Sequence, residues 1–113
     1  MELKIRKAGD NFIIDLDGDM DLYNSHKLKD LVSKMVEKDV KRIIINLDKV
    51  SYIDSSGVGS LIYVCSIIKK LNLKLAMTNI HGSVKKVIEL TRLTDFLPIT
   101  NSIEDAIALF NKG

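Results

Sequence analysis

The segment IIINLDKVSYIDSSGVGSLIYVCSIIKKL, residues 43–71, decides the fold class of this chain. It opens with three consecutive isoleucines, Ile43 to Ile45, a β-branched run that is typical of a strand buried on both faces in the middle of a sheet. From Ser56 to Leu71 the apolar side chains recur at helical spacing on one broad face, which predicts a largely buried helix. A buried strand followed by a buried helix indicates an α/β protein that contains parallel strands.

The sequence on either side of this segment adds further strands and helices. Alternating apolar and polar residues predict two strands near the N-terminus, joined as a hairpin through residues 8–11. Helical spacing predicts a helix over residues 25–38, with Asn24 or Ser25 as its N-cap. The remaining expected elements are a strand over 73–77, a helix around 84–91, a short strand within 96–100 that Pro98 would confine to a sheet edge, and a last helix opened by Ser102 with Asp105 as a capping box. We therefore expect one α/β domain over residues 1–113, with a mixed sheet of four to five strands and about four helices, mainly covering one face.

Length and composition exclude several classes of protein. The chain has 113 residues, of which 46% are hydrophobic and 28% are charged, which suits one globular domain. A formal net charge of +2 and few aromatic residues argue against direct binding of nucleic acid. No stretch approaches the ~18 apolar residues of a membrane span, and the N-terminus lacks the apolar core of a signal peptide. The single cysteine, Cys65, agrees with a reducing compartment, so we expect a cytoplasmic protein that makes no contact with a membrane.

The residues between the central strand and the buried helix are the best candidates for a functional site. Unpaired N–H groups point outward at the start of a helix that follows a parallel strand, and ligands bind there. The simpler interpretation is that Asp54 or Ser55 caps the helix and that Gly57 and Gly59 permit close packing. The spacing of these residues does not distinguish the two interpretations.

The motifs around this junction resemble those of a known family. Asp54-Ser55-Ser56-Gly57-Val58-Gly59, preceded by Ile43-Ile44-Ile45-Asn46-Leu47-Asp48, resembles the signature of STAS domains of the anti-sigma-factor-antagonist family. Gly18-Asp19-Met20-Asp21 is similar to the acidic turn of that family after its second strand. The resemblance extends over nearly the whole chain, and it implies the STAS fold.

The resemblance also implies a function and its participants. In the family, a partner that is both anti-sigma factor and serine kinase phosphorylates the serine directly after the aspartate, which implies Ser55 here. The unphosphorylated protein would bind the anti-sigma factor and release the sigma factor, and the phosphorylated protein would not bind. A PP2C-type phosphatase would reset the cycle, while ATP and Mg²⁺ would belong to the kinase, so the chain itself needs no cofactor or metal. The implied partner-binding residues are Asp21, Tyr23, Asn24, Asp54, Ser55, Ser56 and Gly57.

Some of these residues also have ordinary structural interpretations. Asp21 either ends the second strand through an Asx-type turn or contacts a partner, and the sequence leaves both open. Tyr23 and Asn24 follow in a strand-to-helix connection, where such residues often have no functional role. Cys65 lies on the apolar face of the predicted helix, where a small buried hydrophobe is expected. His26 and His81 lack neighbours at metal-ligand or catalytic spacing.

Two other functions compete with this hypothesis. An enzyme using Ser55 or Ser56 is disfavoured because the chain has no Gly-x-Ser-x-Gly elbow and no P-loop lysine. Gly57 and Gly59 at a helix start could hold a nucleotide phosphate, although that signal is weak. The second alternative is a STAS accessory subunit for another partner, in a stress-signalling complex, in lipid transport or as a nucleotide-binding module, without a phosphosite.

Overall fold

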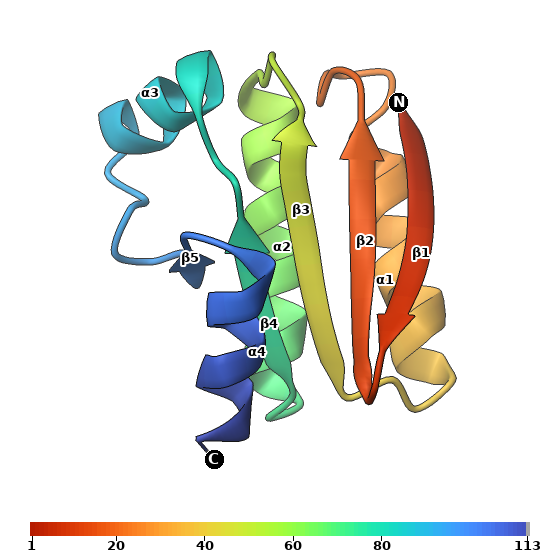
Figure 1. Ribbon diagram of the computed structural model, residues 1–113. Helices are drawn as coiled ribbons and strands as arrows, with labels where there is room; N and C mark the ends of the chain where they lie inside the picture. The colour runs from red at the N-terminus through yellow and green to blue at the C-terminus, as the bar shows by residue number, and fades with distance from the viewer. Residues whose placement is uncertain (113) are drawn as a thin grey trace.

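The computed structural model describes residues 1–112 and contains one five-stranded sheet in the order β1-β2-β3-β4-β5. β1 and β2 pair antiparallel, whereas the later neighbours are parallel. Four helices in this part of the chain complete the fold (Figure 1). The elements are β1 (Glu2–Ala8), β2 (Asn11–Asp17), α1 (His26–Glu37), β3 (Arg42–Lys49), α2 (Ser55–Lys70), β4 (Lys74–Thr78), α3 (Gly82–Leu90), β5 (Ile99–Thr100) and α4 (Ile103–Asn111). The predicted α/β class and mixed sheet are confirmed.

The central strand β3 is buried on both faces, as its isoleucines predict. Ile43 and Ile45 are fully buried in the larger core, which α1, α2 and α3 complete. Ile44 points to the other face and packs in a smaller cluster with Ala106 and Phe110 of α4. The helices therefore cover mainly one face, and α4 covers part of the opposite face (Figure 1).

Two details near the predicted boundaries refine the sequence expectation. Ser25 is the N-cap residue of α1, but its side chain makes no capping hydrogen bond. It is buried, and its carbonyl oxygen accepts a 2.8 Å bond from the Ser60 hydroxyl of α2. The fifth strand has only two residues, Ile99–Thr100, and it lies at the sheet edge as Pro98 predicts.

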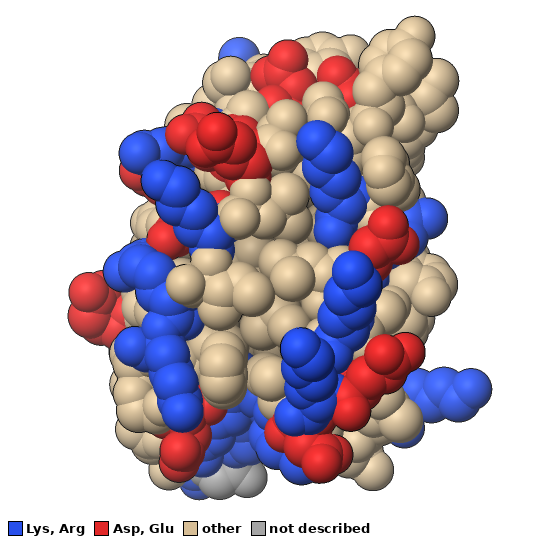
Figure 2. All heavy atoms as spheres, turned by 90° about the vertical axis from the view of Figure 1, so that its right-hand side faces the viewer, with Lys and Arg blue, Asp and Glu red and all other residues tan. Residues whose placement is uncertain are grey.

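The parallel arrangement brings three connections to one end of the sheet. β2 and β3 end near the top of Figure 1, and the chain after β4 rises to the same end, so the β2–α1 turn and the starts of α2 and α3 gather there. β1 forms a side edge of the sheet, so within residues 1–112 its outer side has no neighbouring strand (Figure 1). Figure 2 views the molecule from this side. None of the helices in residues 1–112 is both long and apolar enough to cross a membrane.

Candidate functional site

The start of α2 is held by the carboxylate of Asp54. Asp54 is the N-cap residue in an extended conformation, and its Oδ1 accepts bonds from the N–H groups of Ser56 (2.9 Å) and Gly57 (3.1 Å). Ser55 is thereby the first residue of the helix. The capping interpretation of Asp54 describes this local geometry, because a short acidic side chain satisfies N–H groups that have no partner within the helix.

The same aspartate joins the helix start to the β2–α1 turn. Its second oxygen, Oδ2, accepts a 3.1 Å bond from the N–H of Leu22. Met20 forms an isolated parallel bridge with Ile53, with its N–H donating to the carbonyl of Tyr52 (3.0 Å) and its carbonyl accepting from the N–H of Asp54 (3.1 Å). Two segments more than 30 residues apart are thus bound to each other by backbone groups and one carboxylate.

Gly57 makes this close approach possible. A Cβ atom at position 57 would overlap the carbonyl oxygen of Met20 and lie 2.6 Å from Cγ1 of Ile53. Only a residue without a side chain leaves room for the turn at this point. Gly59, two residues further along the helix, has nothing within 4 Å of such an atom, so the two glycines are not equivalent.

Asp21 shapes the turn in which it lies. Its Oδ1 accepts bonds from the N–H of Tyr23, from the N–H of Asn24 and from the side-chain amide of Asn24, each at 3.0 Å. This is the Asx-type turn that the sequence left as an alternative. It leaves the side chains of Leu22 and Tyr23 exposed, at 67% and 79%.

The two serines differ in accessibility. Ser55 is exposed, whereas Ser56 is partly buried. No hydrogen bond within residues 1–112 holds the hydroxyl of Ser55, which lies beside the Asp54 cap. The structure therefore brings Asp54, Ser55, Ser56 and Gly57 together with the turn of Asp21, Tyr23 and Asn24.

Apolar residues around this surface were missed by the sequence analysis. Leu22, Tyr52 and Tyr63 are exposed to 67%, 50% and 44%. Tyr63 lines an open hollow between α1 and α2, together with Leu22, Ser25, His26, Lys29, Ser56 and Gly59. The spacing of residues 56, 59 and 63 places them on one helical face, and this was the only sequence signal for the hollow. Tyr63 lies on a mostly apolar helix, so the sequence alone suggests that it is buried in the core. Isolated exposed apolar residues are common, but a group beside a helix start indicates a surface that contacts another protein.

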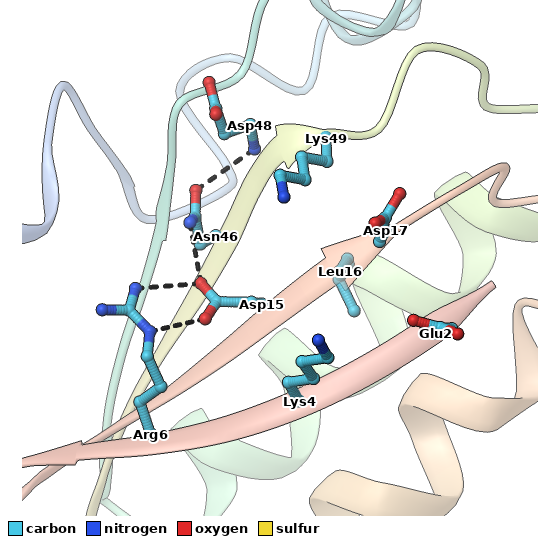
Figure 3. Close-up of a pocket in the computed structure, with 9 residues that line it drawn as sticks. All are labelled: Glu2, Lys4, Arg6, Asp15, Leu16, Asp17, Asn46, Asp48 and Lys49. Carbon is cyan, nitrogen blue, oxygen red and sulfur yellow. Dashed lines mark hydrogen bonds and ion pairs between the residues drawn. The ribbon is translucent and has the colours of Figure 1, made fainter.

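A polar network lies on the other face of the sheet, over β1, β2 and β3 (Figure 3). Arg6 donates from Nε and Nη2 to the carboxylate of Asp15, which also accepts a 2.8 Å bond from Asn46. The amide of Asn79, directly after β4, donates to Asn46 at 2.8 Å. The hydrogen bond from Arg6, opposed by burial, holds the pKa of Asp15 below its usual value. This chain of contacts supports the second strand-to-helix junction, β4 to α3.

The histidines and the cysteine occupy structural positions. The His81 ring forms a 2.8 Å hydrogen bond with the carbonyl oxygen of Asp48, while His26 lines the hollow beside Ser56 without a hydrogen bond among the described residues. Cys65 is 3% exposed and burial raises the pKa of its thiol, so it packs as the predicted small hydrophobe. No group of three or more His, Cys, Asp or Glu side chains in residues 1–112 is arranged to hold a metal ion.

The geometry at this end of the sheet is typical of a protein-binding module. The carboxyl ends of β2 and β3 present a rigid turn, an exposed hydroxyl and a rim of apolar side chains, which together suit recognition of another protein.

The chain belongs to the STAS family, because the STAS domain profile matches residues 2–106. A Bordetella bronchiseptica protein named "Putative anti-sigma factor antagonist BtrV" is 26% identical over 110 residues, which are 97% of this chain and 95% of that protein. The anti-sigma-B factor antagonist of Staphylococcus aureus is 24% identical over 87 residues, covering 77% of this chain and 81% of its own length.

Solved structures share the fold. The anti-sigma factor antagonist SpoIIAA in its unphosphorylated form superposes with a TM-score of 0.73 at 18% identity, covering 99% of both chains. The phosphorylated form of Bacillus SpoIIAA gives a TM-score of 0.71 at 20% identity, covering 96% of this chain and 99% of the other. The relatives that match this chain in sequence are thus regulatory proteins rather than enzymes.

Proposed function

We propose that this chain is an anti-sigma factor antagonist whose binding is switched at Ser55. Its unphosphorylated form binds an anti-sigma factor that is also a serine kinase, which frees the sigma factor, and phosphorylation of Ser55 ends that binding. Membership of the STAS family and the names of the sequence relatives support the antagonist role. The protein acts in the cytoplasm, where ATP and Mg²⁺ are bound by the kinase and a PP2C-type phosphatase removes the phosphate.

The observation that carries the proposal is the position of Ser55. It is exposed and it begins α2. The exposed side chains of Leu22 and Tyr23 lie on the turn that is bonded to its neighbour Asp54, and exposed Tyr52 lies two residues before that aspartate. A kinase can reach this hydroxyl without unfolding the helix. A partner that covers the apolar side chains also covers the serine.

The energetics favour a switch that acts through the interface. A phosphate adds roughly −1.5 to −2 charges at pH 7, and an exposed helix N-terminus stabilises an anion by only about 0.3–1 kcal/mol. That is too little to rearrange α2. An unpaired charge buried in a protein contact costs several kcal/mol, and a loss of ~3 kcal/mol weakens binding more than a hundredfold. Phosphorylation is therefore expected to act mainly by weakening the contact with the partner, with little change in the fold.

The test uses Ser55→Ala and, as the matched control, Ser56→Ala. Each variant is incubated with its cognate anti-sigma kinase and ATP, and the modified residue is mapped by mass spectrometry. We expect Ser56→Ala to be phosphorylated as the parent chain is, and Ser55→Ala to remain unmodified. Both variants should bind the anti-sigma factor, since alanine carries no charge. Full labelling of Ser55→Ala would show that the switch lies elsewhere.

A further inference from the structure

The hollow between α1 and α2 continues the surface around Ser55. The two helices lie side by side on one face of the sheet (Figure 1), and the lining of the hollow comes from both helices and from the turn before α1. Leu22 and Ser56 belong both to this lining and to the network of bonds around Asp54. A partner that covers Ser55 and Leu22 therefore extends to the rim of the hollow.

Gly59 keeps the hollow open. Glycine weakens a helix relative to alanine, and Gly59 lies within α2. The close approach that requires Gly57 has no counterpart here, because a Cβ atom at position 59 would meet nothing within 4 Å. The fold therefore does not require glycine at position 59, and the effect of this glycine is to leave room in the hollow for a group from outside.

The wall of the hollow combines apolar side chains with a cation. Leu22 and Tyr63 are exposed to 67% and 44%, so both offer apolar surface to a ligand. The Nζ atom of Lys29 lies 5.1 Å from the centroid of the Tyr63 ring, where the ring face attracts the ammonium group. Within residues 1–112 Lys29 takes part in no ion pair, which leaves its charge available to a partner.

Among the described residues, those that line the hollow are uncharged or basic. The carboxylates of Asp21 and Asp54 are directed at backbone N–H groups instead. Asp30 is next to Lys29 in sequence but points about 100° away around the helix axis. Tyr63 lies about 13 Å from Asp54 along the axis of α2, which exceeds the ~8 Å Debye length of physiological salt. A carboxylate bound at Lys29 is therefore largely screened from Asp54.

We propose that this hollow binds a segment of the anti-sigma factor in which an apolar side chain stands beside a carboxylate. The apolar side chain packs over Gly59 between Leu22 and Tyr63, and the carboxylate pairs with Lys29. The inference rests on the proposed function and deepens it, because it assigns the chemistry of a second contact with the same partner. Phosphate at Ser55 opposes the first contact, whereas complementary charge at the second contact selects the partner.

A second copy of this chain does not supply the group that the hollow lacks. A two-fold contact of hollow on hollow sets the same lining on both sides. Because none of the described lining residues is acidic, such a dimer offers Lys29 no carboxylate. The complementary charge therefore comes from a different protein.

The experiment measures the affinity of the full chain for its purified cognate anti-sigma factor by isothermal titration calorimetry. We expect Lys29→Glu to weaken binding about tenfold, because attraction to the partner's carboxylate becomes repulsion. Added salt should weaken the binding of the parent chain more than that of Lys29→Glu. The matched control Lys34→Glu makes the same charge change on an exposed part of α1 outside the hollow, and it should bind as the parent chain does.

Gly59→Phe gives a second readout that does not depend on charge. The open space around position 59 lets the variant fold, and its ring occupies the hollow. We therefore expect a urea midpoint close to that of the parent chain together with binding that is weaker by about tenfold or more.

The outcomes separate this inference from the proposed function. If the parent chain binds no anti-sigma factor, the proposed function fails and the inference fails with it. If the parent chain binds and either Lys29→Glu or Gly59→Phe binds equally well, the inference alone is overturned. Tighter binding of Lys29→Glu, an equal loss in Lys34→Glu, or a dimer of the chain alone that Gly59→Phe dissociates would also overturn it.

Discussion

The junctions β3–α2 and β4–α3 occupy equivalent places in the fold but are built differently. Both lead from a buried parallel strand to a helix at the same end of the sheet. α2 begins with an aspartate whose carboxylate caps the helix and bonds the neighbouring turn. α3 follows the N-cap residue His81, whose side chain makes no capping bond, and the start of this helix is joined to the rest of the molecule by single side-chain bonds from His81 and Ser83 to backbone carbonyls.

The difference shows what a recognition surface requires. At β3–α2 the backbone of one junction is bonded to the backbone of another, so the exposed side chains on both keep fixed relative positions. Among the described residues, no such backbone bond joins the β4–α3 junction to a neighbouring one. The bonds through Asp54 and Met20 therefore distinguish the two junctions.

Among substitutions at the two junctions, Gly57→Ala should have the largest effect on the free energy of unfolding. The added methyl group overlaps the carbonyl oxygen of Met20, so the turn must move away from α2, and we expect the free energy of unfolding to fall by about 1–3 kcal/mol. Gly59→Ala has open space around it and should raise stability by about 0.5–1 kcal/mol, as alanine does within a helix. Urea unfolding of both variants measures the contrast. Equal effects of the two substitutions would contradict the close approach described here.

A smaller effect is expected from Asp54→Ala. It removes the cap of α2 and the bond to Leu22, which should cost about 1–2 kcal/mol. His81→Ala removes one hydrogen bond at the other junction and should cost less than about 1 kcal/mol. Thermal unfolding gives the two values, and amide shifts should spread to Leu22 only in Asp54→Ala. If His81→Ala proved the more damaging, the ranking of the two junctions would be wrong.

The smallest effect concerns the network that reaches β4–α3. Because Arg6 lowers the pKa of Asp15 in the folded protein, the ionised carboxylate contributes stability above the ordinary aspartate pKa, near 4, and that contribution disappears as the pH falls through the lowered value. For a partly exposed pair we expect less than about 1 kcal/mol. Asp15→Asn should therefore be slightly less stable than the parent at pH 6, and the gap should close toward pH 2. Urea midpoints across this range measure it; a constant gap would rule out the titration of Asp15 as its cause.

Much of the fold could be predicted because it depends on local patterns. The isoleucines of β3 and the apolar face of α2 each identify one element without reference to the rest of the chain. The packing of α4 against the opposite face of the sheet could not be predicted in this way. Ala106 and Phe110 give the helix an apolar stripe, but a stripe does not say which face of a sheet it covers.

The candidate site was likewise predictable only where it depends on local sequence. A cap at Asp54 or Ser55 follows from residue types at a predicted helix start, and the structure assigns it to Asp54. The bond from Leu22 to Asp54 joins residues 32 positions apart and depends on the sheet order, and the role of Gly57 depends on the carbonyl of Met20 that it meets. Tyr52 and Tyr63 were missed because their exposure is set by neighbouring elements rather than by their own segments.

The β2–α1 turn also has an evolutionary consequence. Its shape is fixed by main-chain bonds and by the carboxylates of Asp21 and Asp54, whereas the side chains of Leu22 and Tyr23 contribute little to it and stand in solvent. These two positions can therefore mutate almost freely as far as folding is concerned. Duplicated copies of such a protein could diverge there first, each acquiring its own partner, and so keep parallel signalling pathways insulated from one another on an unchanged scaffold.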